Sequence, residues 1–126
     1  MKIPQSVVTA GIVIVVLIVS YLLLVTSPKG HYPNFANCLT EHNVSMYGAF
    51  WCTHCADQKN LFGDSWNLVK YTECSTPDGK SKTQECKDAG IESYPTWQFG
   101  DGTRYVGPLT LEELSTRTGC AIDPQE

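Results

Sequence analysis

The N-terminal part of the chain is an unbroken run of apolar positions. No residue between Val7 and Val25 is charged. As a helix this run would be roughly 28 Å long at 1.5 Å per residue, close to the hydrocarbon thickness of a bilayer. A cleaved signal peptide has a shorter apolar core, of about 7–15 residues, that ends at small residues. We therefore expect residues 1–26 to be an uncleaved signal-anchor that contacts the lipid bilayer through residues 7–25, with a cleaved signal peptide as the alternative.

Residues 27–34 have the composition of a linker. They contain two prolines and a glycine, which disfavour a continuing helix. At about 3.3 Å per residue, the linker reaches at most about 26 Å. The domain that follows, residues 35–126, should therefore stay close to the membrane surface.

Beyond the linker, short apolar segments alternate between strand and helix patterns. Helices are expected at residues 35–41, 52–61, 83–89 and 109–117, and strands at residues 44–50, 68–73, 96–99 and 103–106. Thr110 and Glu113 have the spacing of a capping box, and Gly100-Asp101-Gly102 is a hairpin signal between the last two strands. This order predicts an α/β domain with a mixed central sheet flanked by helices.

The distribution of charge argues against two classes of binding partner. All thirteen acidic residues and all but one of the nine basic residues follow the apolar run, and the chain has a net charge of −4. Because no basic stripe is present, nucleic acid is not expected as a partner. Anionic lipid headgroups would not attract this acidic domain either.

The cysteines indicate the compartment. All six follow the apolar run, at positions 38, 52, 55, 74, 86 and 120. This content is too high for an ordinary reduced cytosolic domain. Lys2 and Lys29 flank the run on opposite sides, so charge orients it only weakly. We expect a single-pass cell-membrane protein with its N-terminus in the cytoplasm and its domain in the periplasm or another extracytoplasmic space.

The candidate chemistry lies where a predicted strand turns into a helix, at Cys52 and Cys55. Free N–H groups and the macrodipole at a helix start favour a Cys52 thiolate, and His54 can add positive charge or a hydrogen bond. A stable thiolate is a good leaving group and makes the disulfide more oxidising. Cys55, one turn deeper, would be the shielded resolving thiol.

Two other interpretations of this Cys-x-x-Cys pair are a zinc site and a static disulfide. A structural zinc site needs four ligands, usually in two close pairs. Cys74 and Cys86 are twelve positions apart and form no second Cys-x-x-Cys. We therefore expect a redox-active disulfide with no bound cofactor and no metal.

The segment Trp51-Cys52-Thr53-His54-Cys55, followed by Tyr94-Pro95-Thr96, resembles the thioredoxin superfamily, which pairs W-C-x-x-C with a later cis-proline. A closer resemblance is to the thioredoxin-like domain attached to bacterial vitamin K epoxide reductase homologues. It extends over about residues 35–119 and rests on residues 46–52, 54–55, 57–59, 61–63, 73–74, 86, 89–91, 94–97 and 111–114.

This resemblance implies a thioredoxin-like fold for residues 35–126 and a protein thiol–disulfide oxidoreductase. It assigns catalysis to Cys52, Cys55, His54 and Pro95, and substrate binding to Trp51 and Tyr94. Pro95 would bring the backbone beside Cys52, where an extended substrate segment can pair by strand addition. The aromatic residues Phe50 and Trp51 would otherwise be packing residues, and Asp57 and Lys59 solvated helix residues.

The chain departs from the family pattern in three ways. Thr53 stands where proline is common, and Met46 stands where thioredoxin has a buried aspartate that assists proton transfer to the second cysteine. The four-helix quinone-reducing domain is not found in this sequence, so we expect a vitamin K epoxide reductase-like membrane partner to act in trans.

The remaining four cysteines allow three pairings once Cys52 and Cys55 are joined. The resemblance suggests a structural Cys74–Cys86 bridge, which would stabilise the fold by about 3 kcal/mol in the chain-entropy model. A second redox pair is the alternative. The remaining cysteines, Cys38 and Cys120, would then form a disulfide with each other. The alternatives are that either one is unpaired or links two chains.

Together these inferences predict a membrane-anchored oxidoreductase that oxidises protein thiols through Cys52–Cys55 and is reoxidised by a quinone-linked membrane partner. A thiol–disulfide reductase or isomerase is the first alternative. A non-enzymatic binding module stabilised by static disulfides is the second.

Overall fold

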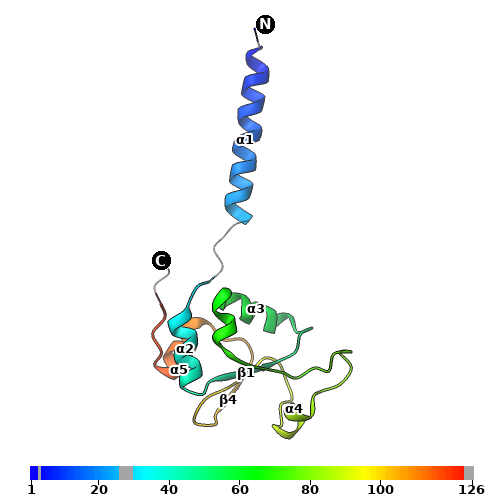
Figure 1. The fold of residues 1–126 in the computed structure, drawn as a ribbon, viewed down its shortest axis with the longest axis vertical. Coiled ribbons are helices and arrows are strands. Elements are labelled where there is room, and N and C mark those ends of the chain that lie inside the picture. The colour runs from blue at the N-terminus through cyan, green and yellow to red at the C-terminus, as the bar shows by residue number, and fades with distance from the viewer. Residues whose placement is uncertain (3, 26–29, 124–126) are drawn as a thin grey trace.

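The computed structural model describes residues 1–2, 4–25 and 30–123 (Figure 1). The first part of the expected linker, residues 27–29, and the last three residues of the predicted domain lie outside the described residues. The elements are α1 (Gln5–Val25), α2 (Pro33–Glu41), β1 (Ser45–Gly48), α3 (Thr53–Phe62), the 3-10 helix η1 (Asp64–Leu68), β2 (Lys70–Glu73), α4 (Gln84–Asp88), β3 (Thr96–Gln98), β4 (Arg104–Val106) and α5 (Leu111–Thr118).

The four strands form one mixed sheet in the order β2-β1-β3-β4. Strand β1 pairs with β2 in parallel and with β3 antiparallel, and β3 pairs antiparallel with β4. The prediction of a mixed sheet flanked by helices is therefore confirmed. The η1 turn was not predicted, and it delays the start of β2 to Lys70.

Helix α1 fits the expected apolar segment. Its Gln5–Leu23 stretch has a mean hydropathy of 2.7, and none of it is buried within the chain. Among the described residues it is the one helix that is long and apolar enough to cross a membrane.

Local sequence signals set the ends of the two helices that matter most here. In α5, the Thr110 side chain accepts a hydrogen bond from the Glu113 N–H at 3.1 Å, and the Glu113 side chain accepts one from the Thr110 N–H at 2.8 Å. This is the capping box that the sequence predicts. Helix α3 ends at Gly63, whose φ of 57° is costly for residues with a side chain.

The main core lies between the sheet and helices α2, α3 and α5. Met46 and Trp97 are register partners in β1 and β3, so their side chains share this face, and both are fully buried. A smaller cluster of Cys74, Cys86 and Ile91 packs against Tyr47, whose side chain points to the opposite face because neighbours alternate along a strand. Figure 1 shows α3 and α4 on opposite sides of the sheet.

Candidate active site

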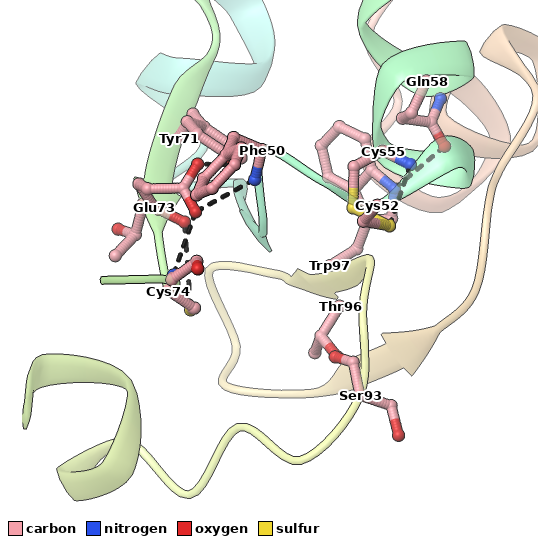
Figure 2. Close-up of a disulfide and its surroundings, with 12 residues drawn as sticks. Phe50, Cys52, Cys55, Gln58, Tyr71, Glu73, Cys74, Ser93, Thr96 and Trp97 are labelled. Carbon is pink, nitrogen blue, oxygen red and sulfur yellow. Dashed lines mark hydrogen bonds between the residues drawn. A yellow bond between two sulfur atoms is a disulfide. The ribbon is translucent and has the colours of Figure 1, made fainter. Parts of the chain in front are cut away.

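A disulfide between Cys52 and Cys55 lies at the start of α3, directly after the end of β1 (Figure 2). The Cys52 N–H donates to the Ala49 carbonyl at 3.0 Å, which closes the turn between strand and helix. Cys52 is the N-cap residue, and its Sγ accepts a hydrogen bond from the Cys55 N–H at 3.2 Å. The helix start is thus already oriented to stabilise negative charge on Cys52 after reduction.

The two cysteines differ in their exposure to solvent. Cys52 retains 9% exposure, whereas Cys55 retains none. A nucleophile from outside can therefore reach Cys52 and not Cys55. This asymmetry is what the division into an attacked and a resolving cysteine requires.

An open hollow of about 480 Å³ lies against Cys52. Its lining comes from the segment that contains the cysteine pair and from the segment before β3: Trp51, Cys52, Thr53, His54, Glu92, Ser93 and Tyr94. The Tyr94–Pro95 peptide bond is cis, and Pro95, the next residue after Tyr94, is fully buried. The structure therefore brings together the two segments that the sequence analysis assigned to the site, with His54 exposed at the rim.

Phe50 and Trp51 are exposed, so the alternative that they are buried packing residues was wrong. Each is 57% exposed. Trp51 is held by an edge-on contact with Tyr94, at 5.8 Å between ring centroids, and its Nε1 donates to the Ser75 hydroxyl at 3.0 Å. Ser75, which follows β2, and Tyr94 hold the Trp51 side chain at the surface, where it lines the hollow.

Glu73 has a role in this site that sequence reasoning missed. Its Oε1 accepts hydrogen bonds from the backbone N–H groups of Phe50 at 3.1 Å and Ser75 at 2.9 Å (Figure 2). Its Oε2 accepts one from the Tyr71 hydroxyl at 2.8 Å. Glu73 is one of the residues on which the resemblance rests. Only the parallel pairing of β1 with β2 places its carboxylate beside the turn between β1 and α3.

The electrostatics around Tyr71 are set by the same contacts. Burial, with a further contribution from the hydrogen bond to Glu73, raises the pKa of Tyr71 well above its ordinary value. Lys59 lies with its Nζ 3.8 Å from the centre of the Tyr71 ring, so it is a half-buried partner rather than the solvated residue we expected. Burial, and then the charge of Glu73, also raises the pKa of Tyr94.

The underside of α3 is fixed by a buried amide, Gln58, which the resemblance included without assigning it a role. It is 1% exposed and hydrogen-bonds to Trp97 and to the backbone of Leu109 (Figure 2 shows the Trp97 contact). Met46, at the position of the missing aspartate, is fully buried among apolar neighbours.

The other four cysteines are joined as Cys38–Cys120 and Cys74–Cys86, with Cα–Cα distances of 5.8 Å and 5.5 Å. Both residues of the second pair are fully buried, which shields it from the thiol exchange that a second redox pair would need. His42 lies close to Cys38 and Cys120, but sulfurs held in a disulfide are not available as thiolate ligands.

Comparison with known proteins shows a likeness to a redox enzyme. No family model matches the chain. The chain is 40% identical over 98 residues to the thiol-disulfide oxidoreductase LTO1 of Arabidopsis thaliana. The match covers 71% of this chain but 26% of that protein, so the chain spans about a quarter of the length of its relative.

Proposed function

We propose that this chain is a thiol–disulfide oxidoreductase that acts through Cys52 and Cys55. The observation that carries the proposal is the asymmetric disulfide at the start of α3, with Cys52 open to the hollow and Cys55 sealed beneath it. The relative's name, thiol-disulfide oxidoreductase, supports the same chemistry. The catalytic roles of His54 and Pro95, the substrate-binding roles of Trp51 and Tyr94, and the thioredoxin-like fold belong to this proposal.

The proposed direction is oxidation of protein thiols. A substrate thiolate attacks Cys52, so that a substrate–Cys52 bond forms, the Cys52–Cys55 bond breaks, and Cys55 leaves with the electron pair. A second substrate thiolate then attacks the substrate sulfur of this mixed disulfide and releases Cys52 as a thiolate. The substrate loses two electrons and becomes a disulfide, and the cysteine pair, after gaining two protons, is a dithiol.

Reoxidation is proposed to occur at a membrane. Helix α1 would anchor the domain on the extracytoplasmic side, and a membrane protein of the vitamin K epoxide reductase type would take the two electrons and pass them to quinone. The apolar length of α1 and the sequence resemblance support this arrangement. A short linker would keep Cys52 close to such a partner.

The reduction potential of Cys52–Cys55 tests the direction. It is measured on the full chain in detergent, by equilibration with glutathione buffers and mass analysis of the trapped thiols. We expect a value toward the DsbA potential of about −120 mV. A value near that of thioredoxin, about −270 mV, would contradict the oxidase and favour the reductase.

A trapping experiment tests whether the pair reacts with proteins at all. Cys55→Ala should accumulate mixed disulfides through Cys52 in the native membrane, and the matched double variant Cys52→Ala/Cys55→Ala should accumulate none. If the single variant captures no protein, the chain is better explained as a binding module with static disulfides.

A further inference from the structure

Cys55, the proposed resolving cysteine, needs a source of protons. When a nucleophile attacks Cys52, Cys55 leaves as a thiolate, yet Cys55 is fully buried. A buried charge without a partner is costly, so the thiolate must gain a proton or a hydrogen bond. In the reverse step, the buried thiol must lose its proton before it can attack.

The space above Gly48 is bordered both by this sulfur and by one polar side chain. A Cβ atom at Gly48 would lie 3.0 Å from Cys55 Sγ and 3.1 Å from the Tyr71 hydroxyl oxygen. The two atoms thus approach the same point over β1, from α3 on one side and from β2 on the other. The absence of a side chain at Gly48 is what leaves room for this approach.

The register of the sheet explains why Tyr71 is there. Tyr71 pairs with Met46 and Glu73 with Gly48, so all four residues have side-chain positions on the face that α3 covers. Tyr71 is also fixed by an edge-on contact with Trp66, at 5.6 Å between centroids. Because Met46 on β1 is apolar, the polar group near Cys55 comes from Tyr71 on the neighbouring strand β2.

Glu73 lies between Tyr71 and the surface. Its Oε2 accepts the Tyr71 hydroxyl hydrogen bond at 2.8 Å, and the residue is only half-buried, so part of it is in contact with water. The other titratable groups around Tyr71 are Lys59 from α3, with its Nζ 3.8 Å from the ring centre, and Tyr94 from the segment before β3.

We propose that Tyr71 and Glu73 form a proton relay for Cys55. In the oxidising direction, Glu73 takes a proton from water and passes it to the Tyr71 oxygen, while the Tyr71 hydroxyl proton moves to the Cys55 thiolate. Tyr71 is unchanged, Glu73 is again a carboxylate, and Cys55 is a thiol. The reverse transfer removes the proton when Cys55 attacks a mixed disulfide. This inference rests on the proposed function of the cysteine pair.

The relay predicts a defect confined to the Cys55 step. The full chain, reduced only at Cys52–Cys55, is mixed with 5,5′-dithiobis(2-nitrobenzoate) in a stopped-flow instrument between pH 5 and pH 9. Attack by Cys52 releases the first nitrothiobenzoate anion, and attack by Cys55 on the resulting mixed disulfide releases the second. The two absorbance phases therefore report the two cysteines separately.

Tyr71→Phe keeps the ring and its contacts, and Glu73→Gln keeps the size of the side chain. We expect each variant to slow the second phase by at least about tenfold, compared with the roughly 100- to 10,000-fold that general acid–base assistance typically contributes, and to shift its pH dependence. The first phase should stay within about twofold of the wild type. Tyr47→Phe, on the opposite face of β1, and Glu112→Gln, exposed on α5, are the matched controls and should change neither phase.

The outcomes separate this inference from the proposed function. A wild-type chain that gives no second phase would contradict the redox role of the cysteine pair itself. A wild-type chain with two phases, combined with Tyr71→Phe and Glu73→Gln variants whose second phase keeps the wild-type rate and pH profile, would overturn the relay alone. Equal slowing of both phases without a shift in pH dependence would also overturn it, because that result indicates a structural role.

Discussion

Gln58 of α3 binds the backbone of Leu109 with both ends of its side-chain amide. Its Nε2 donates to the Leu109 carbonyl at 2.8 Å, and its Oε1 accepts from the Leu109 N–H at 2.7 Å. The Trp97 indole donates to the same Oε1 at 3.3 Å. One side chain therefore fixes α3 both to β3 and to the segment before α5.

Replacing Gln58 with Ala should destabilise the fold substantially. Three buried polar groups would lose their partner, and each unsatisfied group costs about 1–3 kcal/mol. We expect a loss of at least about 2 kcal/mol in the free energy of unfolding, measured by urea denaturation under non-reducing conditions. Asn60→Ala, exposed on the same helix, is the control. A Gln58→Ala chain as stable as Asn60→Ala would show that these bonds contribute little.

Gly48→Ala should disturb the site without adding polarity or charge. The added carbon would lie 3.0 Å from both Cys55 Sγ and the Tyr71 ring, which is too close for ordinary contact. We expect a destabilisation of about 1–3 kcal/mol, typical of overpacking, together with an altered rate of reduction of Cys52–Cys55 by dithiothreitol. Gly11→Ala, with open space around it, controls for the substitution itself. Unchanged stability and reduction rate would mean that β1 and α3 are not tightly packed here.

The two structural disulfides should differ in their contribution to stability. Cys38–Cys120 spans 82 positions and Cys74–Cys86 spans 12. In the chain-entropy model these loops correspond to about 4–5 and about 3 kcal/mol. Urea unfolding of Cys38→Ala/Cys120→Ala and Cys74→Ala/Cys86→Ala should therefore show the larger loss for the first pair. The opposite order would indicate that local packing around Cys74 and Cys86 outweighs loop entropy.

Stability should fall at alkaline pH in a way that depends on Tyr71. Burial raises the pKa of Tyr71 in the folded chain, whereas an unfolded tyrosine titrates near about 10. Above that pH the unfolded state loses a proton that the folded state keeps, so the stabilisation present below about pH 10 is lost as pH rises toward the folded value. The Tm of Tyr71→Phe should decline less steeply between pH 9 and pH 11 than that of the wild type. Parallel declines would mean that Tyr71 titrates alike in both states.

Much of the fold could be predicted from the sequence because its signals are local. The capping box at Thr110, the hairpin glycines and the apolar run each act over a few residues, and each was found at or near its expected place. Cys52 and Cys55 were identified for the same reason, because their spacing and the helix start lie in one short segment. The 3-10 helix η1 was harder to predict, because a short 3-10 turn has no strong hydrophobic period.

The amino-acid pattern alone was enough to identify a cysteine pair at a helix start, a likeness to a redox family and an apolar segment long enough to span a bilayer. The surroundings of the pair became visible only in the folded chain: Tyr71 and Glu73 lie over Gly48, Gln58 lies beneath α3, and Phe50 and Trp51 are exposed. The cause is the separation of these residues along the chain. Those contacts depend on the parallel register of β1 with β2 and on helix packing, which join residues more than twenty positions apart, and no local pattern encodes them.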